Sequence, residues 1–373
     1  MAAGVNPKSP LPMDVGLAAG DSPRARRIAE QSIADLKLDL RGLVVYTEAA
    51  SGPYVFTPLV AALAGADRVF AVTRTSSFAT REHVEATTNA LAQEWAVADR
   101  LDVRFEKIQH DVAASDVITN TGFVRPIDRA TIGWMKSTAV IPLMWETWEI
   151  RDGELDLLAC RERGIVVLGT REDRAPHSIY PYCGFSAMKL LFELGLEGYR
   201  TRVTLLGRGV LAASIHAVFA GIGIDVEWFG DGGAQARPYG EFRRCWLEAG
   251  ASRDVLLLAD HHTRVPLVGD NGLVSCDELL TVNPVVRIGI ISGQADFAAL
   301  RRVGVRMFPE QPRPFGYMSY HSDALGPRGV LELYAAGLKV GEAMARARLA
   351  GCSPEETRRR ALRESPAMDF VRS

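Results

Sequence analysis

Apolar positions along the chain fall into two alternating patterns, which are short runs of strand length and longer stretches with helical spacing. After the amphipathic segment PRARRIAEQSIADLKL, runs such as LVVYTEA and RVFAVTR alternate with helical stretches such as REHVEATTNALAQEWAVA. The short runs are apolar nearly throughout, which is typical of parallel strands buried on both faces. The alternation predicts an α/β fold with a doubly wound sheet.

The alternation breaks at 170–182, where TREDRAPHSIYPY carries two prolines and a cluster of charges. A second α/β series then runs from RVTLLG through IDVEWFG and DVLLLAD to VVRIGIIS. We therefore expect two Rossmann or flavodoxin-like domains with a cleft between them. The expected parts are a flexible tail (1–22), a substrate-side domain (23–178, with helix 327–350 packing back) and a dinucleotide-binding domain (183–322).

Composition narrows the class of partner. The 373 residues include 43 basic and 45 acidic side chains, a net charge of -2, so no global field would attract nucleic acid or an anionic membrane. No apolar run approaches the roughly 18 residues of a membrane span. The N-terminus lacks the basic head and apolar core of a secretory signal. We expect a cytoplasmic protein with a small-molecule partner.

The five cysteines are widely spaced and form no CxxC pair, which favours reduced thiols over a disulfide framework or a zinc site. His261 and His262 are adjacent, and side chains of adjacent residues in an extended chain point to opposite sides. We therefore expect no shared metal, and we place His261 in a polar loop beside a cofactor.

The strongest motif is Gly207-x-Gly209-x-x-Ala212, which lies between an apolar strand and an apolar helix. In this context the first glycine permits a tight turn, the second lets backbone amides approach a pyrophosphate, and the small third residue keeps helix and strand close. The sequence predicts a dinucleotide site, and a turn that binds nothing is the alternative. The expected cofactor-binding residues around the turn are Gly207, Arg208, Gly209, Val210 and Leu211.

An acidic residue is expected near the end of the second strand, where it would hold the ribose hydroxyls of the cofactor. Asp231 comes 24 residues after Gly207, one position later than the end of the strand at Gly230. Arg208 or Arg237 would instead favour a 2′-phosphate. The prediction is therefore NAD, with NADP not excluded.

Over most of its length the chain resembles the D-isomer-specific 2-hydroxyacid dehydrogenases. The resemblance rests on ELDLLACRERGIVVLGT before the hinge, on LLGRGVLAASI, on VLLLADHHT and GIISGQADFAAL, and on SYHSDALGP, which occupies the place of the family's catalytic histidine loop. It implies hydride transfer between a nicotinamide cofactor and a small substrate, and a homodimer.

The resemblance assigns the general acid/base to His321 and its carboxylate partner to Glu310, although Gln311 stands nearest the acid position. The turn that begins at Ser292, a further cofactor-side residue, carries Gln294 where the family has an arginine that clamps the substrate carboxylate. A neutral amide is a poor replacement for a bidentate guanidinium, so the sequence departs from a plain 2-hydroxyacid dehydrogenase here, unless Arg125, Arg171 or Arg264 enters from another loop.

Candidate substrate-binding residues lie after apolar strands of the first domain, in loops suited to holding a polar group. They are Asn120, Arg125, Glu146 and Arg171. An ordinary surface loop is the alternative for Arg125, and an interface or core corner is the alternative for the Trp145–Glu149 segment. The loop after Glu48 lacks a full glycine fingerprint, so we favour a structural role for it.

Together these features predict an enzyme, an NAD(P)-dependent oxidoreductase that acts on a small polar hydroxy, keto, amino or imino compound. Two alternatives remain open. One is an NAD-dependent hydrolase or lyase that uses transient oxidation, and the other is a non-catalytic dinucleotide-binding protein whose dehydrogenase site has decayed.

Overall fold

The computed structural model of the chain describes residues 21–174, 176, 178–231, 233–315, 317–320 and 322–370, without the side chain of Ser322. His321 and nearly all of the predicted tail, residues 1–20, lie outside the described residues. The chain forms two compact units, Met1–His177 with Val330–Ser373, and Ser178–Gly329.

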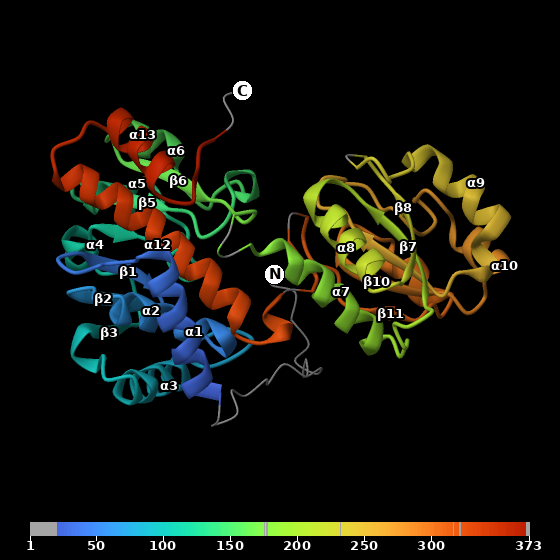
Figure 1. Cartoon of the computed structure of the whole chain (residues 1–373), viewed down its shortest axis with the longest axis horizontal. Coiled ribbons are helices and arrows are strands. Elements are labelled where there is room, and N and C mark those ends of the chain that lie inside the picture. Colours follow the sequence, from blue (N-terminus) through green and yellow to red (C-terminus); the bar gives the residue numbers. More distant parts are fainter. Residues whose placement is uncertain are drawn as a thin grey trace, which may run out of the picture. The chain divides into compact units, whose positions relative to one another are not determined.

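The first unit is built on a seven-stranded sheet (Figure 1). All neighbouring strands are parallel except the pair at one edge of the sheet. That pair is antiparallel, and it aligns Ala367 with Thr170 and Met368 with Gly169. In sheet order the strands are β12 (Ala367–Met368), β6 (Val166–Thr170), β5 (Val140–Pro142), β4 (Val117–Ile118), β1 (Val44–Glu48), β2 (Arg68–Val72) and β3 (Leu101–Arg104).

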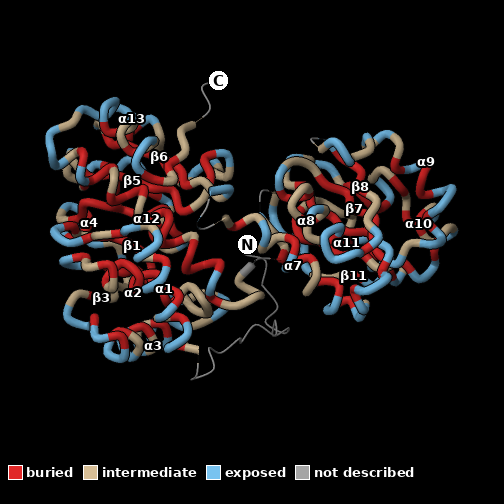
Figure 2. The backbone as a smooth tube through the Cα atoms, viewed as in Figure 1, coloured by how far each residue is buried: buried red, intermediate tan, exposed pale blue. Residues whose placement is uncertain are grey.

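Helices cover both faces of this sheet, and the alternation along β1 shows why. Val45 packs into one apolar cluster with residues of α1, α2 and α12, whereas Tyr46 packs into another on the opposite face. Figure 2 shows the strands as the most buried part of the unit. The helices are α1 (Asp21–Leu36), η1 (Gly52–Phe56), α2 (Thr57–Leu63), α3 (Arg81–Glu94), η2 (Ala98–Arg100), α4 (Gln109–Ala114), α5 (Arg129–Trp134), η3 (Thr147–Glu149), α6 (Leu157–Glu162), α12 (Arg328–Leu349) and α13 (Pro354–Glu364).

Two glycines let α12 pack directly on the sheet of the first unit. A Cβ on Gly341 would lie 2.7 Å from the Val117 side chain, and one on Gly337 would lie 2.6 Å from Met144 Sδ. Helix α12, which follows the second unit in the chain, is therefore part of the core of the unit formed mainly by the N-terminal half.

The second unit is a five-stranded parallel sheet, also covered on both faces. Its strands in sheet order are β11 (Met307–Phe308), β10 (Arg287–Ser292), β9 (Val255–Ala259), β7 (Arg202–Gly207) and β8 (Asp225–Phe229). Its helices are α7 (Tyr180–Glu193), α8 (Gly209–Gly221), α9 (Tyr239–Ala249), η4 (Gly250–Ser252), α10 (Cys276–Val282), α11 (Phe297–Arg302) and η5 (Ser322–Leu325). The prediction of two doubly wound α/β folds is confirmed.

No helix in the described part of the chain is long and apolar enough to cross a membrane.

Candidate functional site

The strand order of the second unit places a switch point between β7 and β9. The chain leaves β7 for β8 on one side and returns through β9, β10 and β11 on the other. In open α/β sheets the crevice at the carboxyl ends of the two strands that flank such a point is where ligands bind. Here those ends are Gly207 and Ala259, which are paired in the sheet.

The glycine turn at the end of β7 has no room for a side chain at Gly207. A Cβ on Gly207 would stand 2.5 Å from the carbonyl oxygen of Ala259 and 2.7 Å from the Ala212 Cβ. Gly209 begins α8 with a φ of 66°, a conformation that glycine adopts without strain. A Cβ on Gly209 would lie 3.3 Å from His262 Nε2. The first turn of α8, with Val210 and Leu211, therefore presents amides and the positive end of the helix dipole, an arrangement that fits a pyrophosphate.

The position of the acid after β8 has a steric cause. A Cβ on Gly230 would stand 1.7 Å from the carbonyl oxygen of Gly207, an oxygen that also accepts a 2.8 Å hydrogen bond from Trp228 Nε1. Position 230 must therefore be glycine, and the acidic side chain comes one residue later. Asp231 is exposed, and its carbonyl oxygen accepts a 3.3 Å hydrogen bond from the Gly209 amide.

Arg208 lies at the centre of a charged cluster around this turn. Its Nη2 is 3.1 Å from Asp231 Oδ2, its Nε is 3.6 Å from Asp260 Oδ2, and its guanidinium stacks 4.8 Å from the centroid of the Tyr239 ring. Arg237, the other arginine that the sequence offered for a 2′-phosphate, bonds instead to Glu227 at 2.7 Å and Glu241 at 2.8 Å.

Asp260, immediately after β9, is the buried member of this cluster. It is fully buried and accepts hydrogen bonds from Tyr239 Oη at 2.7 Å, from Thr263 Oγ1 at 2.7 Å and from the amides of His262 and Thr263. Burial by itself raises the pKa of Asp260, but these hydrogen bonds outweigh it and hold the pKa below its ordinary value. Asp260 is thus a buried carboxylate that is charged at neutral pH.

The two adjacent histidines do not diverge as expected for an extended chain. Their ring centroids lie 4.2 Å apart, because the chain turns at Asp260 and the His262 amide bonds back to that carboxylate. Burial, followed by the neighbouring His262, lowers the pKa of His261 to about 4, so His261 is neutral at neutral pH. Among the described residues there is no group of three or more side chains able to hold a metal ion.

The loop after β10 lies beside the same edge. Ser292 is buried, its carbonyl oxygen accepts a 3.1 Å hydrogen bond from the Asp260 amide, and the residue forms a bridge with Met318. The Ser319 and Tyr320 amides bond to the carbonyl oxygen of Ile291, which fixes the segment that precedes the predicted catalytic histidine. Glu310 is exposed in the loop after β11.

The first unit has its own switch point, between β1 and β4, and two of the predicted substrate residues lie near it. Asn120 is buried, and its Oδ1 accepts a 2.8 Å hydrogen bond from the Met144 amide, so it ties the ends of β4 and β5 together. Arg125 forms an ion pair with Glu154 and stacks on Trp145. Both side chains therefore have structural partners.

The other two predicted substrate residues follow β5 and β6. Glu146 is buried and accepts hydrogen bonds from Trp148 Nε1 at 2.7 Å and from the Glu172 amide at 3.2 Å. Arg171 pairs with Asp173 at 2.6 Å. The structure thus brings all four predicted substrate residues to the carboxyl edge of one sheet.

A buried polar network around Glu48, the last residue of β1, also lies at this edge and was missed from the sequence. A chain of hydroxyl groups joins Tyr334 to Thr47 at 3.0 Å, Thr47 to Thr119 at 2.9 Å and Thr119 to Thr121 at 3.1 Å. Burial raises the pKa of the Glu48 carboxyl, whose Oε2 accepts a 2.9 Å hydrogen bond from the Phe123 amide. A glutamate that ends an apolar strand was the available signal.

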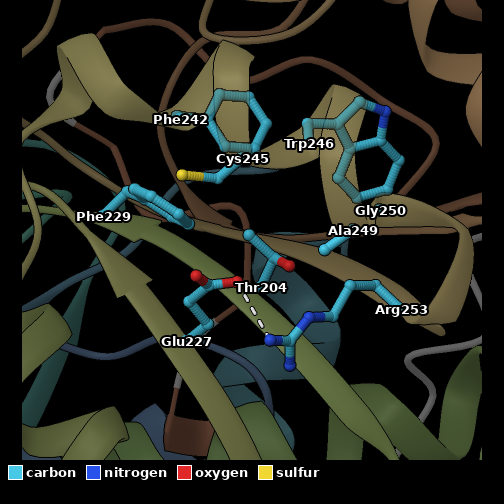
Figure 3. A pocket seen from close by; sticks show the side chains of 9 residues that line it. All are labelled: Thr204, Glu227, Phe229, Phe242, Cys245, Trp246, Ala249, Gly250 and Arg253. Atoms are coloured by element: carbon cyan, nitrogen blue, oxygen red, sulfur yellow. Dashed lines mark hydrogen bonds and ion pairs between the residues drawn. The ribbon is translucent and has the colours of Figure 1, made fainter.

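A narrow cavity in the second unit lies away from the glycine turn, between β7, β8 and α9 (Figure 3). The space between its lining side chains is too narrow to admit a water molecule. Figure 3 shows the Glu227–Arg253 ion pair beside Thr204 and the ring of Phe229 near the Cys245 thiol. This cavity is a packing defect and no ligand site.

The sheets and helices define a doubly wound α/β protein with a glycine turn at the switch point of its second unit. No family model and no curated protein matches the chain. Similar solved structures include a dipicolinate synthase subunit from Bacillus halodurans, which is 13% identical over 83% of this chain and 99% of that chain, with a TM-score of 0.49.

Two further similar structures are 2-hydroxyacid dehydrogenases, the family that the sequence resembles. The enzyme from Ketogulonicigenium vulgare is 12% identical over 84% of this chain and 96% of that chain, with a TM-score of 0.43. The NAD-complexed enzyme from Lactobacillus delbrueckii is 11% identical over 84% of this chain and 99% of that chain, also with a TM-score of 0.43.

Proposed function

We propose that this protein is an NAD-dependent oxidoreductase that acts on a small polar hydroxy, keto, amino or imino compound. The observation that carries the proposal is the turn at the switch point, where Gly207 has no room for a Cβ, Gly209 has a positive φ and α8 begins. A tight turn of this shape at this place in the sheet is suited to the pyrophosphate of a dinucleotide.

Several residues of the second unit would then bind different parts of the cofactor. Amides from Gly209 to Leu211 would hold the pyrophosphate, and Asp231 would hold the adenosine ribose hydroxyls. The neutral ring of His261 and the Ser292 loop would line the nicotinamide side, where the bound cofactor supplies hydride chemistry.

For the proton, we propose His321 as general acid/base with Glu310 as its carboxylate partner. For the substrate, we propose the carboxyl edge of the first unit, with Asn120, Arg125, Glu146 and Arg171. Gln294 in place of an arginine supports a substrate that lacks the carboxylate of a simple 2-hydroxy acid.

Calorimetric titration of the purified protein with NAD⁺, NADH, NADP⁺ and NADPH tests the binding step. Gly209→Ala is expected to weaken NADH binding at least tenfold, because its φ is positive and the new Cβ would crowd His262. Gly221→Ala, at the open end of the same helix, is the matched control and should bind as the wild type does. A wild-type protein that binds none of the four nucleotides would overturn the proposal.

Absorbance at 340 nm, with a panel of small carbonyl, hydroxyl and amino compounds, tests the chemistry. His321→Ala should abolish turnover and leave NADH affinity nearly unchanged. Tightly retained nucleotide without net redox would instead support a hydrolase or lyase that uses transient oxidation. Binding without any turnover across the panel would support a non-catalytic dinucleotide-binding protein.

We further propose a cytoplasmic homodimer. All five cysteines are free thiols in the structure, which supports a reducing compartment. The outer face of α7 exposes Phe185 and Phe192, each more than half exposed, and exposed aromatic side chains in a row favour association with a second copy.

A further inference from the structure

We propose that Glu48 binds a primary ammonium group, which narrows the ligands of the first unit to amino compounds. That this ligand is the substrate rests on the proposed function. The binding itself does not, because the residues that carry it all belong to the first unit.

The first step is the place of Glu48 in the sheet. Glu48 is the last residue of β1, and β1 and β4 flank the switch point of the first unit. Ligands of open α/β sheets bind outside the carboxyl ends of the strands at such a point. The chain after β4 reaches across to β1, because the Phe123 amide donates to Glu48 Oε2 at 2.9 Å. The Glu48 carboxyl therefore lies where this sheet is expected to hold a ligand.

The second step is that the carboxyl has no counter-ion. Only 7% of the surface of Glu48 is accessible, and no residue that the structure describes forms an ion pair with it. Two cations, Arg125 and Arg74, act on Glu48 electrostatically, but both are held elsewhere. Arg125 pairs with Glu154. Arg74 donates to the carbonyl oxygens of Phe123 at 2.7 Å and Arg125 at 2.9 Å.

The carboxyl group is also not needed to hold the fold together. Burial raises the pKa of Glu48, although the Phe123 amide and the two arginines act in the opposite direction. A glutamine would accept the same amide hydrogen bond without the cost of a buried acid. An acid at this position therefore points to a ligand that neutralises it.

The third step is the chemistry around the carboxyl. Burial, followed by the charge of Glu48, raises the pKa of Tyr334, so the Tyr334 hydroxyl lies close to Glu48 and keeps its proton. This hydroxyl belongs to the chain that continues through Thr47. Gly122 flanks the carboxyl on another side, and a Cβ there would lie 3.1 Å from Glu48 Oε2. The surroundings thus offer hydroxyl oxygens and a carboxyl.

An ammonium group fits these surroundings better than the other small polar groups do. It has three N–H donors, so it can bond to the carboxylate and to a hydroxyl oxygen together, and its charge supplies the missing counter-ion. A hydroxyl group of the same size brings one donor and no charge. A carboxylate would be repelled. Glu48 therefore selects an amino compound.

The neighbouring acids do not offer this function. Glu154 pairs with Arg125 and, at 3.1 Å, with Arg151. Glu146 accepts hydrogen bonds from Trp148 and from the Glu172 amide. Selection of an ammonium group at this edge therefore depends on Glu48.

Calorimetric titration of the full chain at pH 7, without cofactor, tests the inference with alaninamide and lactamide. The two compounds differ in one group, an ammonium in alaninamide and a hydroxyl in lactamide. The wild type is expected to bind alaninamide at least tenfold more tightly than lactamide. Glu48→Gln keeps the size of the side chain and removes its charge, so it should bind alaninamide at least tenfold more weakly than the wild type and lactamide equally well.

Glu106→Gln is the matched control, because it removes an exposed carboxylate from the loop after β3 at the same edge of the sheet, and it should bind both compounds as the wild type does. Circular dichroism and urea unfolding show whether the carboxyl is structural. The unfolding midpoint of Glu48→Gln should equal or exceed that of the wild type, because the Phe123 bond remains and the buried acid is gone.

A wild type without preference for alaninamide overturns the inference. So does a Glu48→Gln variant that keeps the preference, and so does a Glu106→Gln variant that loses it to the same extent. A Glu48→Gln variant that fails to fold, or that unfolds at lower urea, would make the carboxyl structural and also overturn it. NADH titration keeps the two proposals apart. A protein that binds NADH and shows no preference for alaninamide leaves the proposed function standing, and one that prefers alaninamide but binds no nucleotide leaves only the Glu48 site standing.

Discussion

A buried polar atom without a hydrogen-bond partner lowers the stability of the folded chain. Thr204 in β7 is buried, and its Oγ1 has no hydrogen-bond partner within the described structure, beside the narrow cavity that Figure 3 shows. A buried hydroxyl without a partner destabilises the folded state by roughly 1–3 kcal/mol relative to an apolar group of the same shape.

Thr204→Val is therefore expected to raise the free energy of unfolding by about 1 kcal/mol. Urea denaturation at 25 °C measures it. Thr119→Val is the matched control, because Thr119 Oγ1 bonds to both Thr47 and Thr121, and its loss should destabilise the protein by about 1 kcal/mol or more. If both variants lose stability equally, the Thr204 hydroxyl has a partner in solution.

The glycines of the turn show which single residues could be predicted from the sequence. Gly207 and Gly209 were recognisable because their spacing between an apolar strand and helix follows from the need for close backbone approach. Gly230 was not, because its requirement comes from the carbonyl oxygen of Gly207, 23 positions earlier, and only the folded sheet brings the two together.

At the scale of elements, the short helix η3 after β5 carries an unusual charge arrangement. Glu146 caps η3, and Glu149 closes the same capping box from its last position. Burial, together with repulsion from Glu146, raises the pKa of Glu149 to about 7, and burial with repulsion from Glu149 raises the pKa of Glu172 well above its ordinary value.

These shifts predict a loss of stability with rising pH. A carboxyl whose pKa is higher in the folded state binds more protons when folded, so the free energy of unfolding falls as pH rises from about 4.5 to about 7. Glu149→Gln should match the wild type near pH 4.5 and be more stable by about 2 kcal/mol at pH 8, allowing for partial exposure.

Urea unfolding at several pH values, followed by tryptophan fluorescence, measures this difference, since Trp145 and Trp148 flank Glu146 in the chain. Glu106→Gln, which removes an exposed carboxyl from the loop after β3, is the control and should show no pH-dependent gain. A Glu149→Gln variant that tracks the wild type from pH 4.5 to pH 8 would contradict the raised pKa.

The elements themselves were largely predictable, since long apolar runs such as DVLLLAD have one stable place in a sheet covered on both faces. The short strand near the C-terminal end was not predicted. Residues 367–368 form β12 beside β6, and Arg358 pairs with Asp369. Two residues carry no periodicity, so only the neighbouring strand reveals them. The contact between Arg208 and Asp260, 52 positions apart, has the same origin.

At the scale of the whole molecule, the exposed surface of α7 bears on whether two copies of the chain associate. Gly184 of this helix approaches Val218 of α8 so closely that a Cβ would lie 2.4 Å from it, which fixes the inner face of α7 against α8. Phe185 and Phe192 are two turns apart on the exposed side, with 52% and 54% of their surface accessible.

A face of this kind suits an isologous contact, in which the same helix meets its copy across a two-fold axis. We expect the wild type to sediment as a dimer at micromolar concentration and Phe185→Glu/Phe192→Glu to sediment as a monomer, because four added carboxylates would meet in the dimer interface. Phe78→Glu, on an equally exposed aromatic residue of the first unit, is the matched control and should remain dimeric. A double variant that remains dimeric would place the interface elsewhere, whereas a dimeric Phe78→Glu beside a monomeric double variant would assign self-association to α7.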